Sequence, residues 1–414
     1  KYLKLWKAIM SSRPLTMLFI SSSFKGEVML QTAKALGCRV LLVIEETLRN
    51  QPWPRESIDE FHYVADLRRY QDVIYAVSWM CRGEVIDYIL PLDEFEVELV
   101  AMLREHLRLP GTGVSAIRNF RDKLIMREKT SNAGILVPPF IGIKNYDQLR
   151  EYMDRVPPPW VLKPRTEAGS MGISKPQNSE EVWRALDNLG DSQSYYLLEK
   201  FIPGDVYHVD TLTVDGKIVF VSAQRYGAPP MQVYQGGGVF NSRIVPRDSD
   251  DVKQLKALNQ QVISALGMQN GVTHCEFIKA HEDGRIYFLE VAARVGGAFI
   301  SDMIEKATNV NLWREWCRLE VARLRGETYQ LPEVRDDYGG LLVTLAKWEH
   351  PDLSSYNAPE VVWKTDKPYH AVLVVVSPDQ ARIEALLTEY TNRFVQDFTT
   401  SAPAVGATRT GHAG

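Results

Sequence analysis

Apolar and polar residues alternate with two different periods along the N-terminal part of the chain. The apolar run "LTMLFISSS" is followed by "GEVMLQTAKALG", whose apolar residues are spaced as on one face of a helix, and then by a second apolar run, "CRVLLVIEE". Strand-length apolar runs on either side of an amphipathic helix predict a βαβ unit, and "VIDYILPLDEFEVELVAMLREHLRLPG" repeats the pattern. We therefore predict an open parallel α/β domain over residues 1–118, in which "LTMLFI" is the first strand and not a secretory signal.

The pattern changes after residue 118. The helical stretch "NFRDKLIMREKTSNAG" leads into strand-like runs separated by Gly and Asp turns, which predicts an α+β domain. We divide this domain into residues 119–200, which carry a glycine-rich loop, and residues 201–330. Residues 331–414 add further strands and a helix and close in a segment rich in Gly, Ala and Thr, which we expect to be disordered.

Composition narrows the class of protein. A chain of 414 residues is long enough for two or more packed domains. Its net charge of -4 gives no basic surface for nucleic acid, and no apolar run approaches the roughly 20 residues of a membrane span. The four cysteines form no CxxC pair and no zinc-ligand spacing, which fits a reducing cytoplasm. No GxGxxG follows the first strand, so the N-terminal domain is expected to hold part of a substrate or only to support the rest.

Two apolar strand-like runs, "VTHCEFIKA" and "IYFLEVAARVGG", are each interrupted by one acid, Glu276 and Glu290. The turn "HEDGR" lies between them. With a three-residue loop at 282–284, Glu276 lies directly opposite Glu290, and His274 opposite Ala292. A two-residue loop would instead place the two glutamates on opposite faces, because a slip of one residue reverses every side chain.

Two facing carboxylates need a compensating charge. At about 5 Å and an effective dielectric of about 20 they repel by roughly 3 kcal/mol, which favours a bound cation or a shared proton. Magnesium suits one or two carboxylates whose shell is completed by phosphate oxygens. The alternative is a pair of solvated glutamates on a strand face, which their apolar flanks disfavour.

Lysines and glycines upstream suggest how a phosphate would be held. In "WVLKPRTEAGSMGI" a strand with Lys163 and Arg165 precedes a loop whose small residues are Gly169, Ser170 and Gly172. Closely spaced glycines let backbone N–H groups approach phosphate oxygens, and a lysine adds a point charge. A surface Gly-Ser hairpin is the simpler alternative for this loop, and a surface lysine is the simpler one for Lys123 in "FRDK".

The order of these features resembles the ATP-grasp superfamily of carboxylate-amine ligases over residues 119–320. The matching features are a lysine that opens a helix, a strand lysine before a glycine loop, the hinge "LLEKFIPGDVYHVD", two glutamates and an arginine. The nearest subgroup in this resemblance is the L-amino-acid ligases, with biotin carboxylase and D-alanine-D-alanine ligase as more distant relatives. The resemblance implies an ATP-grasp fold preceded by a Rossmann-like α/β domain.

The resemblance also implies an ATP site. Glu199 would accept a hydrogen bond from the adenine amino group, and the backbone of residues 200–202 would lie along the base edge. Glu276 and Glu290 would hold Mg²⁺, with Mn²⁺ as a substitute. The implied nucleotide-binding residues are Lys123, Lys163, Gly169, Ser170, Met171, Gly172, Glu199, Lys200, Phe201 and Ile202.

The implied reaction forms an amide bond. A substrate carboxylate would attack the γ-phosphate of ATP, and an amine would then displace phosphate from the acyl phosphate, leaving ADP and phosphate. Lys123, Lys163 and Arg294 would stabilise the transferring group, and loop 166–173 would close over it. The expected substrate contacts, for an amino acid, are His274, Arg294, Gly296 and Gly297. A homodimer is compatible with this reading.

Two positions depart from the family pattern. Ala292 stands where many relatives have an asparagine that binds the second metal ion, and Val206 stands where they often have a glutamate for the ribose. We expect Asp205 or His208 to replace the ribose contact, the alternative being weaker contacts to the ribose. We expect the His274 ring to use the space beside Ala292 and to contact substrate, the alternative being a core histidine bonded to backbone.

Three classes of function remain open on the sequence. The first is a ligase that joins an amino acid or similar carboxylate to an amine, and the second is a carboxylase that works through carboxyphosphate. The third is a non-catalytic ATP-binding protein, which Ala292 and Val206 would explain. Retention of both lysines, both glutamates and the arginine argues against the third class.

Overall fold

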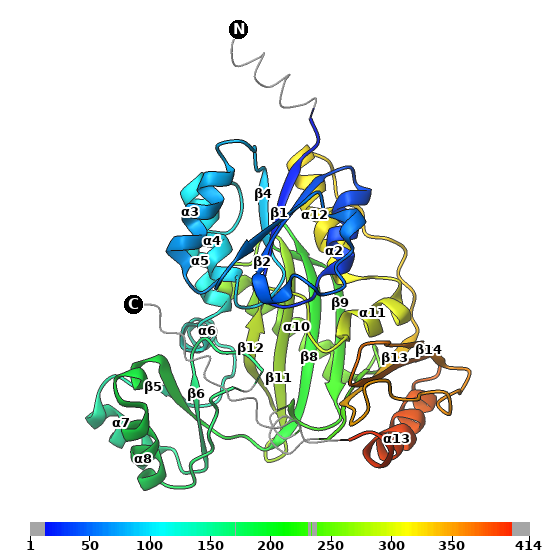
Figure 1. Ribbon diagram of the computed structural model, residues 1–414. Coiled ribbons are helices and arrows are strands. Elements are labelled where there is room, and N and C mark those ends of the chain that lie inside the picture. The colour runs from blue at the N-terminus through cyan, green and yellow to red at the C-terminus, as the bar shows by residue number, and fades with distance from the viewer. Residues whose placement is uncertain (1–12, 170, 231–232, 234–237, 400–414) are drawn as a thin grey trace. The chain divides into compact units, whose positions relative to one another are not determined.

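The computed structural model describes residues 13–169, 171–230, 233 and 238–399 (Figure 1). These residues form two compact units, one with the residues up to Ile117 and Trp313–Gln330, the other with Arg118–Leu312 and the described residues from Leu331 onward. Residues 313–330 thus group with the N-terminal unit, and not with residues 201–312 as the sequence suggested. The predicted disordered tail falls largely on residues 400–414, outside the described part.

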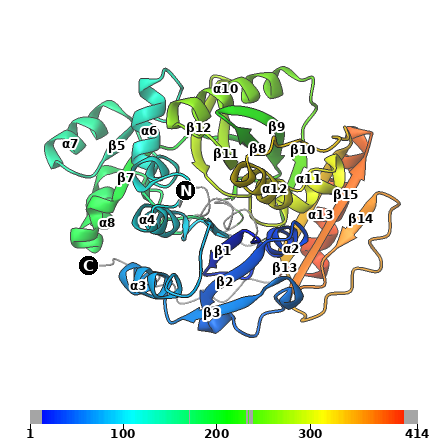
Figure 2. The ribbon, with the colours of Figure 1, turned by 90° about the horizontal axis from the view of Figure 1, so that it is seen from above.

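The N-terminal unit is built on a parallel sheet, as predicted. Its strand order is β3-β2-β1-β4, and every residue of β1 is buried. Helices α3 and α4 lie on one side of the sheet and α2 on the other (Figure 2), and Leu18 and Ile20 of β1 share a core with Val77 of α3 and Leu103 of α4. The elements are β1 (Thr16–Ser21), α2 (Glu27–Ala35), β2 (Arg39–Glu45), β3 (Glu60–Val64), α3 (Tyr70–Met80), β4 (Tyr88–Pro91), α4 (Val97–Leu107), α5 (Val114–Ile117) and α12 (Leu312–Arg325).

The larger unit contains an eight-stranded antiparallel sheet. Its order is β12-β11-β8-β9-β10-β13-β15-β14, so the hairpin with the two glutamates forms one edge. The strands are β8 (Gly204–Val214), β9 (Lys217–Tyr226), β10 (Phe240–Ile244), β11 (Gly271–Ala280), β12 (Ile286–Ala292), β13 (Tyr338–Leu345), β14 (Val361–Lys364) and β15 (His370–Ser377). The helices that accompany them are α6 (Lys123–Asn132), α10 (Asp250–Leu266), α11 (Ile300–Thr308) and α13 (Gln380–Asp397).

A smaller antiparallel sheet of the same unit carries the predicted phosphate lysine. Its order is β5-β7-β6, with β5 (Phe140–Gly142), β6 (Trp160–Pro164) and β7 (Tyr196–Lys200). Helices α7 (Tyr146–Arg155) and α8 (Ser179–Leu189) bury their apolar faces against it. Short 3-10 helices are η1 (Glu46–Leu48), η2 (Arg55–Ser57), η3 (Arg118–Phe120) and η4 (Gly190–Tyr195). No helix in the described ranges is long and apolar enough to cross a membrane.

The β11–β12 hairpin confirms the predicted pairing and corrects the predicted loop. Glu276 lies opposite Glu290 and His274 opposite Ala292. The loop, however, has four residues and not three, because the Ala280 N–H donates to the Arg285 carbonyl. A register shift between Glu276 and Phe277 leaves Leu289 as an extra residue, and this β-bulge restores the pairing that the longer loop would have destroyed.

Candidate active site

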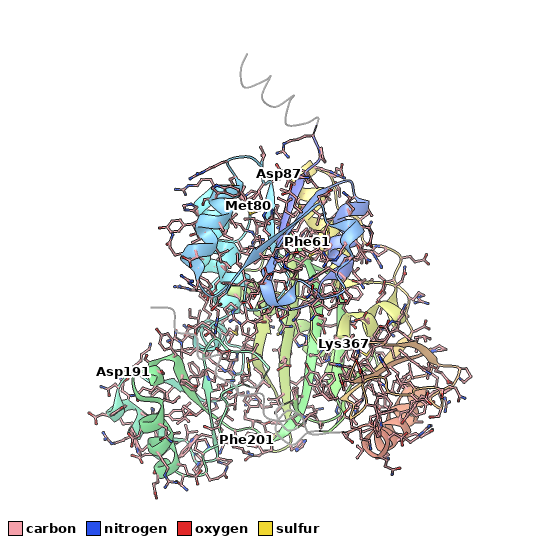
Figure 3. The ribbon with its side chains drawn as sticks, viewed as in Figure 1. Phe61, Met80, Asp87, Asp191, Phe201 and Lys367 are labelled. Atoms are coloured by element: carbon pink, nitrogen blue, oxygen red, sulfur yellow. The ribbon has the colours of Figure 1, made fainter. Side chains whose placement is uncertain are left out.

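One cavity of about 410 Å³ lies between the two sheets of the larger unit and α6. Its wall combines apolar side chains that suit a flat ring with charged side chains that suit phosphate and metal. Phe201, labelled in Figure 3, belongs to the hinge segment between β7 and β8. The apolar lining includes Val161, Ile173, Phe201, Ile202, Val206, Ile278 and Leu289, and the charged lining consists of Lys123, Lys163, Glu167, Lys175, Glu199, Lys200, Glu276 and Glu290.

Most residues expected to bind nucleotide line this cavity. They are Lys123, Lys163, Gly169, Met171, Glu199, Lys200, Phe201 and Ile202. Gly169 and Gly172 have φ values of 64° and 69°, a conformation that favours glycine and lets the loop turn sharply. Gly172 packs beside the cavity and does not line it, and Ser170 lies outside the described residues. The sequence did not single out Lys175, whose Nζ lies 3.3 Å from the centre of the Phe201 ring.

Lys123 links the glycine loop to one of the paired glutamates. It begins α6, which Asp122 caps by accepting a hydrogen bond from the Leu124 N–H at 2.9 Å. Its Nζ donates to the Glu167 carbonyl at 2.6 Å and lies 3.2 Å from Glu290 Oε2. Burial raises the pKa of Glu290, but the charges of Lys123, Lys163 and Arg127 outweigh burial and lower it to about 2. Glu290 is therefore ionised at neutral pH.

A second cluster of charges lies deeper in the wall. Glu199 of β7 receives Lys163 Nζ at 2.5 Å on one oxygen and Arg127 Nε at 3.0 Å on the other. Burial lowers the pKa of Lys163 despite this partner, while the two cations hold the pKa of Glu199 below its usual range in spite of burial. Arg127 was missed on the sequence, although it lies four residues after Lys123 and hence on the same helical face.

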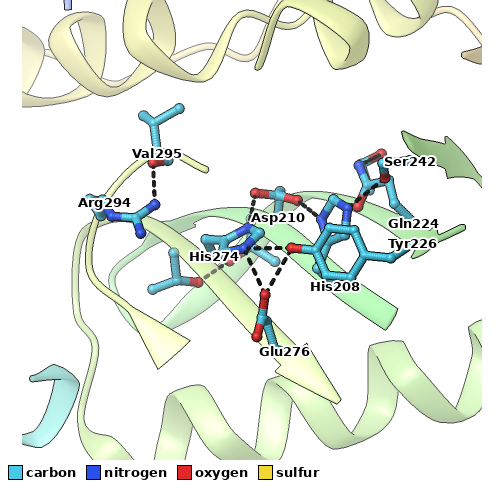
Figure 4. A network of polar contacts seen from close by, with 12 residues as sticks. His208, Asp210, Gln224, Tyr226, Ser242, His274, Glu276, Arg294 and Val295 are labelled. Carbon is cyan, nitrogen blue, oxygen red and sulfur yellow. Dashed lines mark hydrogen bonds and ion pairs between the residues drawn. The ribbon is translucent and has the colours of Figure 1, made fainter. Parts of the chain in front are cut away.

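Glu276 contacts the hydroxyl of Tyr226 and the ring of His274 (Figure 4). The Tyr226 hydroxyl donates to Glu276 Oε1 at 2.8 Å, and His274 Nε2 lies 3.6 Å from the same oxygen. His274 Nδ1 donates to Asp210 Oδ1 at 2.9 Å. Burial lowers the pKa of His274, but Asp210 and Glu276 together outweigh it and raise the value to about 9. His274 is therefore an imidazolium at neutral pH, bonded to side chains of neighbouring strands and not to backbone.

Asp210 also bonds a second histidine, His208, which is fully buried. His208 Nδ1 donates to Asp210 Oδ2 at 2.7 Å, and its Nε2 accepts from the Ser242 hydroxyl at 2.7 Å, as the hydrogen-bond network assigns the tautomer. Burial lowers the pKa of His208 in spite of Asp210. His208 is thus neutral, has no exposed surface and does not line the cavity, which corrects the expected ribose contact. Asp205, the other expected contact, pairs with Arg225 at 2.8 Å away from the cavity lining.

The remaining expected substrate residues, Arg294, Gly296 and Gly297, do not line the cavity. Arg294 lies two residues after the end of β12 at Ala292. Its charge nevertheless acts on Tyr226, where it opposes the rise in pKa caused by burial. A Cβ atom at Gly296 would lie 2.8 Å from Asp210 Oδ1, so glycine is required for this close approach. Gly297 is exposed and has no such constraint.

The His274 ring is also placed differently from the expectation. It is bonded toward β8 and β9 through Asp210 and Tyr226, and its centre lies 5.0 Å from that of His208. It therefore does not lean across Ala292 on the opposite strand.

The donor types at the two glutamates fit magnesium better than the buried histidine cluster does. Glu276 and Glu290 offer hard oxygen ligands at a cavity, as Mg²⁺ prefers. Ligand atoms of His208, Asp210 and His274 also lie within 4.8 Å of one another. In that cluster, however, both Nδ1 atoms already donate to Asp210, and nitrogen is a poor ligand for Mg²⁺.

Comparisons with known proteins agree with this arrangement. Residues 156–302 match the model of the ATP-grasp domain. The chain is 27% identical over 244 residues to an L-arginine-specific L-amino acid ligase of Bacillus subtilis, an alignment that covers 57% of this chain and 58% of that protein. The chain thus spans under two thirds of that relative's length.

Solved structures share the whole fold. An L-amino acid ligase from Bacillus licheniformis superposes with a TM-score of 0.73 at 18% identity, covering 94% of this chain and 98% of that one. An N5-carboxyaminoimidazole synthetase from Staphylococcus aureus, complexed with ADP, gives 0.69 at 18% identity over 91% and 97% of the two chains. The cavity, the strand order and the domain match agree, so this chain carries an ATP-grasp domain over residues 156–302.

Proposed function

We propose that the chain is an ATP-dependent carboxylate-amine ligase that forms an amide bond through an acyl phosphate and releases ADP and phosphate. The proposed substrates are an amino acid as the carboxylate and a small amine. The observation that carries this proposal is the pairing of Glu276 with Glu290 at a cavity that also contains Lys123 and Lys163. Similarity to amino acid ligases supports the substrate class.

The cavity accounts for nucleotide binding in this proposal. The adenine ring would lie against the apolar lining near Phe201, with the backbone of residues 200–202 along its edge. Glu199 would accept from the adenine amino group while Arg127 and Lys163 keep it ionised. Mg²⁺ would be held by Glu276 and Glu290 and would neutralise charge on the phosphates.

The chain's own groups divide the chemistry between them. Lys123 and Lys163 would stabilise charge as an oxygen of the substrate carboxylate bonds to the γ-phosphorus and the bond to the ADP oxygen breaks. The substrate amine then bonds to the acyl carbon, phosphate leaves, and the nitrogen loses a proton. Arg294 and the His274 imidazolium supply positive charge on the Glu276 side, suited to the carboxylate and to the oxyanion of the second step. The loop of residues 166–173 would exclude water from the acyl phosphate.

A screen of amino-acid pairs for phosphate release, with products identified by mass, tests this function. The expected result is ADP, phosphate and a condensed product in equal amounts. Formation of AMP and pyrophosphate would exclude the mechanism. Phosphate without a condensed product would favour a carboxylase, and nucleotide binding without any turnover would favour a non-catalytic protein.

The cellular setting belongs to the same proposal. All four cysteines, Cys38, Cys81, Cys275 and Cys317, are free thiols in the structure. Unpaired cysteines are typical of a reducing compartment, so we place the protein in the cytoplasm. Its partners would be small molecules, and a homodimer is compatible with the proposal.

A further inference from the structure

Arg127 is a fully buried arginine that joins the two sheets at the cavity. From α6, its Nε and Nη2 lie 3.0 and 2.9 Å from Glu199 Oε2 on β7. Its Nη1 donates to the Leu289 carbonyl on β12. One guanidinium therefore holds the nucleotide hinge strand and the strand of the paired glutamates at the same time.

Leu289 is the residue on which the pairing of the two glutamates depends. On the loop side of the bulge, Phe277 pairs with Phe288 and Lys279 with Ile286. If this register continued without a bulge, Glu276 would lie opposite Leu289, and Glu290 would point to the other face of the sheet. The bulge is therefore what brings both carboxylates to one side.

A bulge leaves backbone groups without their ladder partners, and these groups need another partner when they are buried. The Leu289 carbonyl finds it in Arg127. The neighbouring Phe288 N–H is also engaged outside the hairpin, donating to the Leu136 carbonyl at 2.8 Å in the segment after α6. The bulged side of β12 is thus fastened to α6 and the segment after it.

From this geometry we propose that Arg127 is a positioning residue for metal binding, because it holds the Leu289 bulge and thereby sets Glu290 opposite Glu276. This inference rests on the proposed function in assigning a metal to the two glutamates. Arginine suits the role because its planar fork can bond a carbonyl and a carboxylate simultaneously, whereas a lysine ammonium is a single point charge. Arg127 itself would touch neither substrate nor metal.

The test compares Arg127→Lys with a matched control, Arg104→Lys. Arg104 is also a buried helix arginine that donates to a strand carbonyl, that of Ile89 at 2.6 and 3.1 Å, but it belongs to the N-terminal unit. In the ligand-free full chain, hydrogen–deuterium exchange of residues 286–292 should accelerate about tenfold in Arg127→Lys, as expected from the loss of a charge-assisted hydrogen bond. The control should leave this segment unchanged.

ADP binding by calorimetry, with Mg²⁺ and with a chelator, gives the second readout. The gain in ADP affinity on adding Mg²⁺ should fall about 10- to 100-fold in Arg127→Lys and stay at the wild-type level in Arg104→Lys, in the range seen when supports of metal ligands are removed. If wild type itself shows no Mg²⁺-dependent gain, the proposed function fails, while the exchange data still decide whether Arg127 holds the bulge.

Unchanged exchange and unchanged Mg²⁺ dependence in Arg127→Lys would overturn the inference. If that variant does not fold, Arg127→Gln serves in its place, since its amide keeps a donor for the carbonyl without the charge. Failure of both to fold, while Arg104→Lys folds, would also overturn it, because Arg127 would then support the whole unit and not the bulge.

Discussion

Glu276 and Glu290 face each other in one hairpin, but their surroundings differ in kind. Glu290 lies among cations, with Lys123 Nζ at 3.2 Å and a pKa lowered to about 2. Glu276 is bonded to the neutral hydroxyl of Tyr226 at 2.8 Å, with the His274 imidazolium beyond it. The charge of Glu290 is thus compensated by a nearby lysine, whereas the orientation of the Glu276 carboxylate is set by a hydrogen bond from Tyr226.

This difference teaches what each side contributes. In the ligand-free protein the Lys123 ammonium neutralises the charge of Glu290. A bound metal ion would compete with this ammonium for the carboxylate. On the Glu276 side, Asp210 bonds both His208 and His274, so the orientation of the whole network is fixed by groups that are buried. A substitution that removes a charge should therefore reduce activity most at Glu290. A substitution that removes a hydrogen bond should act mainly through the orientation of Glu276.

The largest effect is expected from Glu290→Gln, which removes the negative charge that faces Lys123. Turnover should fall more than about 100-fold, beyond the range for residues that only support a metal ligand, since an amide lacks the charge needed beside Mg²⁺. The fold should persist, because Lys123 keeps its bond to the Glu167 carbonyl. Steady-state kinetics against Mg²⁺, with the exposed turn variant Glu282→Gln as control, measures this. Near-normal turnover of Glu290→Gln at limiting Mg²⁺ would contradict the metal assignment.

The second prediction concerns the imidazolium on the other side. The pKa of His274 is about 9 in the folded protein, above its ordinary 6.5, so its contribution to stability is complete below pH 6.5 and is lost as pH rises through 9. At about 1.4 kcal/mol per pH unit the loss is roughly 3 kcal/mol. Urea unfolding of ligand-free wild type and His274→Gln at pH 6.5 and 9.5 should show a smaller drop in the variant by that amount. Equal drops would mean that His274 is not held as an imidazolium.

A smaller effect is expected from Tyr226→Phe, which removes the hydroxyl that bonds Glu276 Oε1 at 2.8 Å and lies 3.3 Å from His274 Nε2. The Mg²⁺ concentration for half-maximal activity should rise about tenfold, at the lower end of the range for a lost support of a ligand. The ring contact of Tyr226 with His208, at 4.5 Å between centres, remains in the variant. Tyr207→Phe, in the neighbouring strand β8, is the control. No change in the Mg²⁺ requirement would show that Glu276 needs no such bond.

Ala292→Asn should have the smallest effect of the four substitutions. It would add an amide oxygen near the two glutamates. Because the His274 ring is bonded toward β8 and β9, an asparagine opposite it should not crowd the ring. Its amide oxygen should instead tighten Mg²⁺ a few-fold, with little change in the KM for the amino acid. Titration of Mg²⁺ followed by titration of substrate at saturating metal separates the two constants. A raised KM with unchanged metal affinity would restore the expectation that His274 uses the space beside Ala292.

Local patterns predicted a large part of this arrangement. The apolar runs of β1 and β2 with the amphipathic α2 between them are enough to indicate a parallel α/β unit, because burial on both faces leaves no polar period in such strands. The two glutamates were found because a carboxylate in a buried strand is costly and needs a reason. Their pairing was confirmed, although the loop was one residue longer than predicted.

The structure decided what depends on contacts between distant segments. Arg127 joins α6 to Glu199 and to Leu289, which are 72 and 162 positions away. Tyr226 reaches Glu276 from another strand, and Asp210 reaches His274 across 64 positions. No periodicity along the chain reports such bonds.

The sequence by itself therefore determined the elements, the acids and lysines that line the cavity, and the period that puts side chains on one face of a strand. These follow from short-range sterics and from the cost of burying charge, which every residue carries with it. Only the tertiary structure decided that a bulge at Leu289 compensates for a four-residue loop, and that His208 is enclosed and does not reach the cavity. Those outcomes depend on which buried donor meets which acceptor once the sheets pack, because a buried polar group takes its partner from wherever the fold supplies one.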